Sequence, residues 1–298
     1  MKKMLFLMNP NAGQRKAARF LAEILTIFQE GGYEVTVFMT TGPGDGVKIV
    51  EPRVGEYDLI VCAGGDGTLN ETISGVLRSG IDCPVGYIPC GSTNDFAATL
   101  KLSTDVLQAA RDIMMGTDQY YDLGVFNDRY FSYVASFGAF TRVSYTTPQN
   151  LKNVLGHMAY LLSGIQELGQ IRKIPMSLVM DGEQVEGEYI FGAVSNATSL
   201  GGVISLSPRY VDLHDGKFEV MLVRMPKDLA EVGACVQALQ TQEYDCEPIT
   251  FRSVSSLTIR QGDDVDWTLD GERADRAEVI HIENLNRAFC LRHRQESL

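Results

Sequence analysis

The chain has 298 residues, a formal net charge of -12 at pH 7 and a hydrophobic fraction of 45%. This length and apolar content suffice for one large domain or two ordinary domains with packed cores, and they exclude a disordered chain. The acidic balance opposes the attraction that dominates binding to nucleic acid, so nucleic acid is excluded as the main partner. The chain shows no membrane-length apolar run, and its six cysteines lack metal-ligand spacing, which predicts a cytoplasmic protein with reduced thiols.

The first third of the chain alternates short apolar runs with helical patterns, which is typical of parallel βαβ units. We predict strands at residues 5–8, 33–40, 59–62 and 85–88, and helices at 14–30, 45–50 and from the loop after the third strand to residue 77. Ligand loops of parallel sheets lie at the carboxyl ends of the strands. Four polar loops should therefore meet at one edge of the sheet, at residues 9–13, 40–46, 64–70 and 91–95.

The loop after the third strand has the composition of a phosphate-binding turn. Gly64, Gly65 and Gly67 leave backbone N–H groups accessible to a polyanion and permit the positive φ angles of a tight turn. Asp66 can bind Mg²⁺ directly or through water, and Thr68 can donate its hydroxyl to phosphate beside the dipole of the following helix. An ordinary strand-to-helix turn is the alternative, but the combination of glycines, acid and threonine favours a phosphate site.

Past residue 122 the pattern changes to that of antiparallel hairpins. Turn pairs at residues 127–128, 181–182 and 215–216 separate alternating runs such as residues 218–223, and two helices are predicted at 148–169 and 227–241. The sequence thus predicts a parallel α/β domain over residues 1–122 and a mainly antiparallel domain over residues 123–298, whose C-terminal segment can return to the first domain.

Several of these loops resemble the motifs of a known family in composition and order. The family comprises soluble lipid kinases of the diacylglycerol-kinase catalytic type, to which sphingosine and ceramide kinases are related. Its opening NPxxG loop and its central GGDGTLNE motif are both present, and GSTNDFA is close to its GTxNDFAR. In chain order, the matching segments are residues 9–13, 40–45, 64–71, 91–97, 121–124, 207–216 and 269–272. The resemblance covers nearly the whole chain.

The resemblance implies that the α/β domain binds ATP and Mg²⁺, that a C-terminal β-sandwich presents the lipid, and that nucleotide and metal occupy the cleft between the domains. It also implies a set of nucleotide-binding positions in the four loops. These are Asn9, Pro10, Asn11, Ala12, Gly13, Thr40, Gly64, Gly65, Asp66, Gly67, Thr68, Leu69, Asn70, Glu71, Gly91, Ser92, Thr93 and Asn94.

Three acids have catalytic roles by the same resemblance. Asp66 would lie nearest the catalytic Mg²⁺, Asp122 would belong to a supporting acid network, and Glu272 would be the general base for the lipid hydroxyl. From sequence alone, Asp122 could equally be a cap or turn residue, and Asp-Gly-Glu also suits a plain hairpin.

Bacterial members of this family can hold a second, structural Mg²⁺. The matching positions are Asp215 with the backbone of Asp212 and Lys217, although an Asp-Gly pair is more often a simple turn.

The sequence departs from the family pattern at a few loop positions: Cys90, Ser92, Thr93 and Ala98 alter the fourth loop, and Asp45 replaces a common histidine. We expect an ATP- and Mg²⁺-dependent kinase of a lipid alcohol, with diacylglycerol as the favoured acceptor and phosphatidic acid as its product. A kinase of NAD or of a sugar phosphate is an alternative, because such enzymes share the GGDG-type loop. A nucleotide or lipid sensor without turnover is another.

Contact with a membrane surface is expected to be transient and local. It would use a basic cluster at the C-terminus formed by Arg287, Arg292, His293 and Arg294. An exposed strand edge of the second domain could also pair two copies of the chain into a homodimer.

Overall fold

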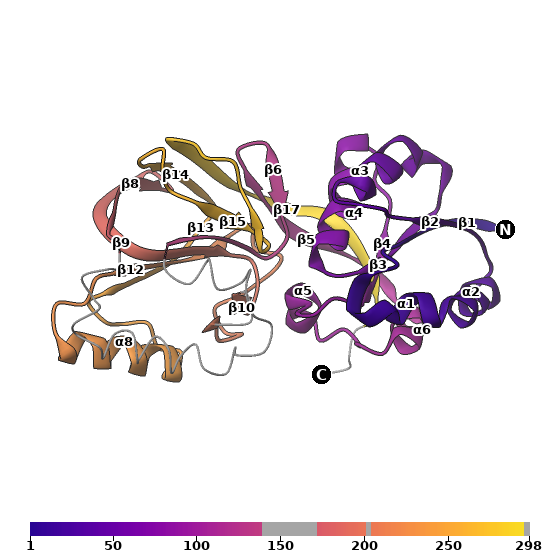
Figure 1. Cartoon of the computed structure of the whole chain (residues 1–298), viewed down its shortest axis with the longest axis horizontal. Helices are drawn as coiled ribbons and strands as arrows, with labels where there is room; N and C mark the ends of the chain where they lie inside the picture. Colours follow the sequence, from indigo (N-terminus) through magenta and orange to yellow (C-terminus); the bar gives the residue numbers. More distant parts are fainter. Residues whose placement is uncertain (139–171, 201–203, 295–298) are drawn as a thin grey trace. The chain divides into compact units, whose positions relative to one another are not determined.

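A computed structural model describes residues 1–138, 172–200 and 204–294 (Figure 1). The chain divides into two compact units, Met1–Asp122 together with the segment from Arg287, and Leu123–Asn286. The helix predicted at residues 148–169 lies outside the described residues. None of the described helices has the length and apolar character needed to cross a membrane.

The first unit contains the predicted parallel sheet. Its strands run in the order β2 (Tyr33–Met39), β1 (Lys2–Met8), β3 (Leu59–Gly64), β4 (Val85–Pro89) and the end of β17 (Val279–His293), which in turn pairs with β5 (Thr117–Phe126). Every residue of β3 and β4 is buried, because helices cover both faces of the sheet. The central strands are therefore continuous apolar runs rather than alternating ones.

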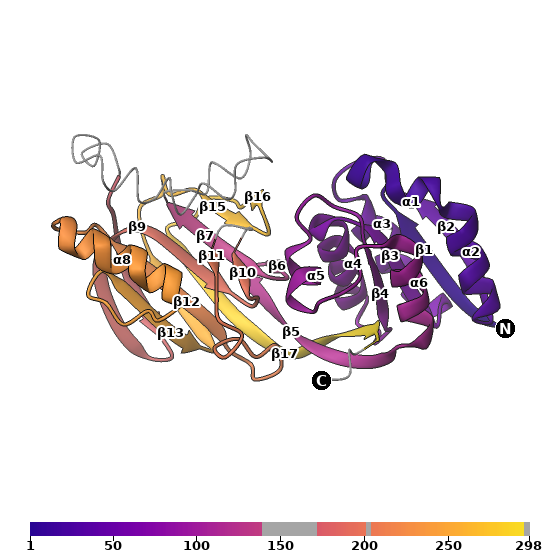
Figure 2. The same cartoon turned by 90° about the horizontal axis from the view of Figure 1, so that it is seen from below.

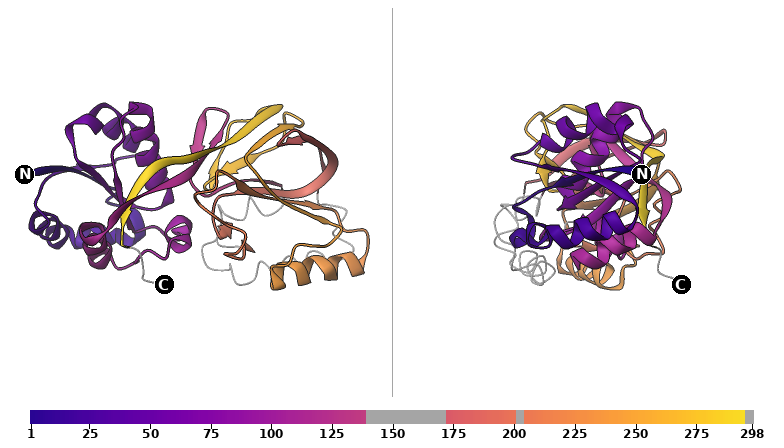
Figure 3. Two further views of the ribbon diagram at one scale, coloured as in Figure 1. Left: turned by 180° about the vertical axis from the view of Figure 1, so that it is seen from behind. Right: turned by 90° about the vertical axis from the view of Figure 1, so that its right-hand side faces the viewer.

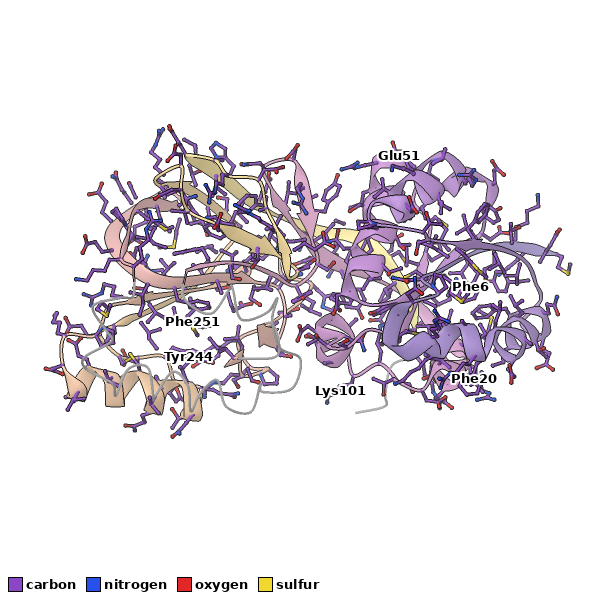
Figure 4. All side chains as sticks on the ribbon, in the orientation of Figure 1. Phe6, Phe20, Glu51, Lys101, Tyr244 and Phe251 are labelled. Carbon is purple, nitrogen blue, oxygen red and sulfur yellow. The ribbon has the colours of Figure 1, made fainter. Side chains whose placement is uncertain are left out.

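Helices α3 (Asp45–Val50) and α4 (Asp66–Ser79), joined by the 3-10 helix η2 (Glu51–Glu56), cover one face of this sheet, and α2 (Leu21–Glu30) and α6 (Val106–Met115) cover the other (Figures 1 and 2). The core on the second face includes Phe6 and Phe28, whose rings meet edge to face at 5.5 Å between centroids. Phe6 is labelled within this unit in Figure 4.

The helix predicted at residues 14–30 is not continuous. It consists of the 3-10 helix η1 (Ala12–Arg15), α1 (Lys16–Arg19) and α2, because Arg15 adopts a left-handed φ of 63° and Phe20 leaves the helical region. Two helices were not predicted, α5 (Asp95–Thr99) and α6. An N-cap signal precedes α6, since the Asp105 carboxylate accepts the N–H groups of Leu107 and Gln108.

The second unit is mainly antiparallel, as predicted. One run of paired strands is β16 (Glu272–Arg273), β15 (Trp267–Leu269), β7 (Val134–Gly138), β9 (Glu183–Ser195), β8 (Ile174–Met180), β14 (Ser256–Arg260) and the start of β17. β12 (Phe218–Arg224) pairs with both β9 and β13 (Ile249–Val254), and β6 (Arg129–Phe131) pairs with β5. A short ladder joins β10 (Ser199–Leu200) to β11 (Ile204–Ser205).

Strand β12 is buried on both faces rather than alternating between core and solvent. Phe218, Val220 and Leu222 belong to the core between the two sheet layers, together with Trp267. Met221 and Val223 belong to a second core under α8 (Leu229–Thr241), which covers one face of this unit (Figure 2). Tyr244 and Phe251 also pack there, with ring centroids 4.6 Å apart (Figure 4).

The predicted turn pairs differ in what they connect. Asn127 and Asp181–Gly182 have positive φ angles and close the β5–β6 and β8–β9 hairpins. The Asp215–Gly216 pair is a turn as well, but it leads into β12, whose partners are β9 and β13, so it does not close a hairpin.

Candidate active site

Three of the four predicted loops meet at the carboxyl ends of β1, β3 and β4. The backbone N–H of Asn9 donates to the carbonyl of Ala63 at 2.9 Å, and that of Cys90 donates to the carbonyl of Gly64 at 2.7 Å. Within the first loop, Asn9 Oδ1 accepts the N–H of Asn11 at 3.0 Å. The loops at residues 9–13, 64–70 and 90–95 thus form one continuous polar edge, as the parallel topology predicts.

The glycines of these loops are required by the approach of backbone to backbone. Gly13 has a φ of 50°, and a Cβ there would lie 1.7 Å from the carbonyl oxygen of Cys90. A Cβ on Gly91 would lie 2.6 Å from the Cα of Gly65. Sequence reasoning assigned Gly64, Gly65 and Gly67 to ligand access and to positive φ angles, but none of the three has a positive φ. The close approach of Gly91 to Gly65 shows instead that glycine here allows the loops to pack together.

The second loop is fixed to the same edge by Glu71 on α4. Its two carboxylate oxygens accept the N–H groups of Gly44 at 2.6 Å and Gly46 at 2.8 Å. At the start of the loop, the buried Thr40 donates its backbone N–H to the Met8 carbonyl at 3.0 Å. Glu71, implied as a nucleotide contact, therefore anchors the loop in this structure.

Asp45 organises the tip of this second loop. Its Oδ2 accepts the Thr41 N–H at 2.8 Å, the Thr41 hydroxyl at 2.7 Å and the Gly42 N–H at 2.9 Å. These hydrogen bonds, led by that of the Thr41 hydroxyl, lower the pKa of Asp45. The acid that replaces the family's histidine is thus a local turn former.

Asp66 begins α4 and also reaches the fourth loop. Its carboxylate accepts the N–H of Asp95 at 3.2 Å and that of Phe96 at 3.4 Å, so it caps α5. A carboxylate has about four acceptor positions, so it can in general accept backbone N–H groups and ligate a cation together. Carboxylate oxygen is the ligand that Mg²⁺ prefers, and Asp66 therefore fits the predicted metal role.

The remaining loop positions divide by exposure. Ser92 and Thr93 are exposed, whereas Thr68 and Leu69 are buried, so only the backbone of Leu69 could contact a ligand. Asn94 adopts a left-handed φ of 53° and bonds both backbone groups of Gly91, accepting at 2.8 Å and donating at 3.0 Å. Its amide thus shapes the fourth loop.

Asp122 is fully buried in the first unit. Its Oδ1 accepts the backbone N–H of Arg287 at 2.7 Å, and Arg287 has a left-handed φ of 51° within β17. This bond supports the structural alternative for Asp122, since it fixes the point at which β17 joins the first unit. Its role in catalysis stays a prediction.

Glu272 lies in the second unit, at the start of β16 and directly after the turn that connects β15 to β16. Its side chain is 59% exposed, and its Oε2 lies 3.7 Å from Nη2 of Arg129. Arg129 was not singled out from the sequence, because no motif connects it to a residue so far along the chain.

The second predicted metal site forms an acidic turn in the second unit. Asp212 Oδ1 accepts the N–H of His214 at 3.0 Å, and Asp215 Oδ1 accepts the N–H of Lys217 at 2.9 Å. The Lys217 carbonyl accepts a hydrogen bond from Asn284 at 2.8 Å. Among the described residues, no group of three or more His, Cys, Asp or Glu side chains could hold a metal ion. A site of one carboxylate and two carbonyls would need no such group and stays a prediction.

A buried acid next to this turn was missed from the sequence. Glu219 on β12 is 2% exposed, and its Oε2 has no hydrogen-bond partner among the described residues. Burial, reinforced by the charge of Asp215, raises the pKa of Glu219 to about 8. An acid inside an otherwise apolar strand was the signal available in the sequence.

The C-terminal basic cluster is not a free cationic surface. Arg292 donates two hydrogen bonds to the carboxylate of Asp118, at 2.6 and 2.7 Å, and one to the Tyr33 hydroxyl at 2.8 Å. His293 is buried, and burial lowers its pKa. Arg287 and Arg294 of the same cluster are exposed, so the predicted membrane contact stays a prediction.

Two family models match the chain. Residues 3–126 match the diacylglycerol kinase catalytic domain, and residues 134–283 match the YegS C-terminal NAD kinase beta sandwich-like domain. Together with the parallel α/β unit and its glycine-lined loops, these matches define the class of the protein as a kinase built from an α/β domain and a β-sandwich domain.

Relatives over nearly the full length carry the same family name. The chain is 32% identical to a diacylglycerol kinase of Bacillus subtilis (strain 168), over 91% of this chain and 90% of that protein. It is 31% identical to a diacylglycerol kinase of Staphylococcus aureus (strain MRSA252), over 95% and 90%. A crystal structure of a diacylglycerol kinase from Bacillus anthracis str. Sterne superimposes with a TM-score of 0.78 at 25% identity, covering 98% of this chain and 97% of that one. The chain belongs to the diacylglycerol kinase family.

Proposed function

We propose that the protein transfers the γ-phosphoryl group of ATP, with Mg²⁺, to the hydroxyl of a lipid alcohol, and that diacylglycerol is the acceptor and phosphatidic acid the product. The observation that carries this proposal is the meeting of three glycine-containing loops at the start of α4, where Asp66 lies. The family and the names of the relatives support diacylglycerol as the acceptor.

The residues of the first unit would bind and orient the nucleotide. Backbone N–H groups of the loops and the N-terminal end of α4 would receive phosphate oxygens, and Asp66 would hold the metal ion. When bound, ATP with Mg²⁺ supplies the transferable phosphoryl group and compensates its charge. Because phosphoryl transfer needs little covalent help from the protein, the main task of these loops is to hold the phosphates in line with the acceptor.

Glu272 would accept the proton of the lipid hydroxyl. As the bond from the hydroxyl oxygen to phosphorus forms and the bond from phosphorus to ADP breaks, the O–H bond breaks and its proton passes to the carboxylate. The alcohol is far less acidic than a carboxylic acid, so this transfer occurs only as the oxygen loses electron density in the transition state.

A kinase of NAD is the second candidate, and one observation favours it. The family model matched by residues 134–283 is described as NAD kinase beta sandwich-like. The two candidates differ in their acceptor, so thermal unfolding in the presence of NAD separates them. A rise in melting temperature with NAD, without any effect of diacylglycerol micelles, would favour the NAD kinase.

The test of the proposal is phosphate transfer from labelled ATP to a panel of lipid alcohols in mixed micelles. We expect Asp66→Asn and Glu272→Gln to lower transfer to diacylglycerol by roughly 100-fold or more, because each removes a charge needed in the transition state. Asparagine can still accept a backbone N–H, so the capping of α5 should persist.

Asp105→Asn is the matched control for Asp66→Asn. Asp105 also accepts two backbone N–H groups at the start of a helix of the same unit, at 3.1 and 2.8 Å, but it lies outside the loops. This control should keep full activity. Full transfer by Asp66→Asn would contradict the metal role of Asp66. If the wild type binds ATP but transfers phosphate to no alcohol, the result would favour a nucleotide or lipid sensor without turnover.

A further inference from the structure

The turn that carries Glu272 is held firmly on one side. Asp270 and Gly271 have φ angles of 50° and 82° and connect β15 to β16. The Asp270 carboxylate accepts three backbone N–H groups at the start of β7, from Ser132 at 2.6 Å, Tyr133 at 3.0 Å and Val134 at 3.1 Å. The backbone before Glu272 is thereby fixed to a central strand of the unit.

Arg129 holds the other side of the same turn. It lies on β6, directly after the β5–β6 turn, and its Nη1 donates to the carbonyl of Arg273 at 2.9 Å. Its Nη2 lies 3.7 Å from Oε2 of Glu272. One planar guanidinium therefore contacts both the carboxylate of Glu272 and the backbone that follows it. The compact ammonium group of a lysine lacks this forked geometry.

This ion pair is too exposed to be explained by stability. The side chains of Arg129 and Glu272 are 34% and 59% exposed, and exposed pairs of this kind contribute little to the free energy of unfolding. Its geometric effect is more specific, because one contact is to the Glu272 carboxylate and the other fixes the backbone that follows it.

We propose that Arg129 is a positioning residue for Glu272, which fixes the direction of the carboxylate that receives the hydroxyl proton. This inference rests on the proposed function, in which Glu272 is the general base. Proton transfer requires the base to lie within hydrogen-bond reach of the hydroxyl, so an unrestrained Glu272 would be correctly oriented in only a fraction of encounters.

The test compares Arg129→Met with Arg252→Met. Arg252 forms an ion pair with Glu183 in the same unit, and its side chain and that of Glu183 are similarly exposed, at 40% and 63%. We expect Arg129→Met to lower kcat by roughly ten- to a hundredfold while the KM for ATP and the melting temperature stay unchanged. Arg129→Lys should restore only part of the rate, and Arg252→Met should behave as the wild type.

A double variant shows whether Arg129 acts through Glu272. If it does, the kcat of the double variant Glu272→Gln/Arg129→Met should be no lower than the kcat of Glu272→Gln alone. A further loss in the double variant would overturn the inference in favour of a separate role. An unchanged kcat in Arg129→Met, beside an impaired Glu272→Gln, would also overturn it while leaving the proposed kinase intact.

A second readout needs neither nucleotide nor lipid. Hydrogen exchange of the amides at residues 268–273 should be faster in Arg129→Met than in the wild type, because the bond to the Arg273 carbonyl is lost, and it should not change in Arg252→Met. Unchanged exchange in Arg129→Met would contradict the anchoring of the turn. Absence of phosphate transfer by the wild type to any lipid alcohol would instead overturn the proposed function, and the role of Arg129 with it.

Discussion

Individual carboxylates at the candidate site hold backbone N–H groups as well as charge. Asp66 caps α5, Glu71 fixes the second loop, Asp45 forms its tip, and Asp270 fixes the turn of Glu272. The loops therefore depend on side-chain oxygen acceptors for their shape. Functional tests at these positions should use amide substitutions, since asparagine and glutamine still accept a hydrogen bond whereas alanine would change shape and charge together.

Gly13→Ala tests how tightly the loops are packed. Gly13 has a φ of 50°, and its Cβ would lie 1.7 Å from the Cys90 carbonyl, so both the backbone and the neighbouring loop must shift. We expect a loss of roughly 2 to 4 kcal/mol in the free energy of unfolding, measured in urea, and weaker ATP binding.

Gly32→Ala separates the two causes of that loss. Gly32 also has a positive φ, 86°, but a Cβ there would meet nothing within 4 Å. It should cost only about 1 kcal/mol and leave ATP binding unchanged. Equal losses in the two variants would show that backbone conformation, and not contact between loops, explains the glycine at residue 13.

Among the elements, β17 has an unusual position because it completes both units. Its first half pairs with β14 in the second unit, and Leu291 near its end pairs with Val85 of β4 in the first (Figure 3). His293 fixes this end. It is buried, its Nε2 lies 2.6 Å from the Tyr121 hydroxyl on β5, and its Nδ1 lies 3.2 Å from the Arg294 carbonyl. A neutral ring satisfies both contacts.

The end of β17 should therefore lose stability in acid. Burial lowers the pKa of His293 below its ordinary value of 6.5, although the nearby Asp112 opposes the shift. The unfolded chain then binds a proton before the native one, so stability is intact above pH 6.5 and falls as the pH drops towards the native pKa.

We expect His293→Gln to remove this part of the acid dependence in urea unfolding between pH 7 and 5. The matched control is His281→Gln on the same strand, where the ring is exposed, and it should leave the acid dependence in place. A wild-type slope that persists in His293→Gln would assign the acid sensitivity to other groups.

How far the sequence predicts an element depends on where its determinants lie. The glycine loop, β3 and α4 were predicted because strand, turn and helix signals are adjacent in the chain. The burial of β12 on both faces and the contact of Arg129 with Glu272 depend on segments far apart in sequence. Helix α6 was overlooked although its cap at Asp105 and apolar positions were visible.

The whole molecule is assembled from two units with a discontinuous first unit, which ends with the segment from Arg287. The chain leaves the first unit after Asp122 and re-enters it at Arg287, and these two residues are joined by a hydrogen bond of 2.7 Å. Without the segment from Arg287, the buried Asp122 would lose this donor and β4 would lose a neighbouring strand.

We expect residues 1–122 joined by a short glycine linker to residues 287–298 to fold and to bind ATP with Mg²⁺. Residues 1–122 alone should be less stable by roughly 3 kcal/mol or more, because a buried carboxylate loses a partner. Urea unfolding and nucleotide titration of both fragments are the measurements. Equal stability of the two would show that β17 is dispensable to the first unit.

The late position of β17 in the chain also affects when the first unit can be completed during synthesis. A ribosome that has made the glycine loops and most of the second unit has not yet made the strand that β4 and Asp122 require. Domains usually fold in order as they emerge, but here the first unit is complete only after the whole second unit and the segment from Arg287 have been made. A chain that lacks β17 would thus leave the edge of β4 without this neighbouring strand.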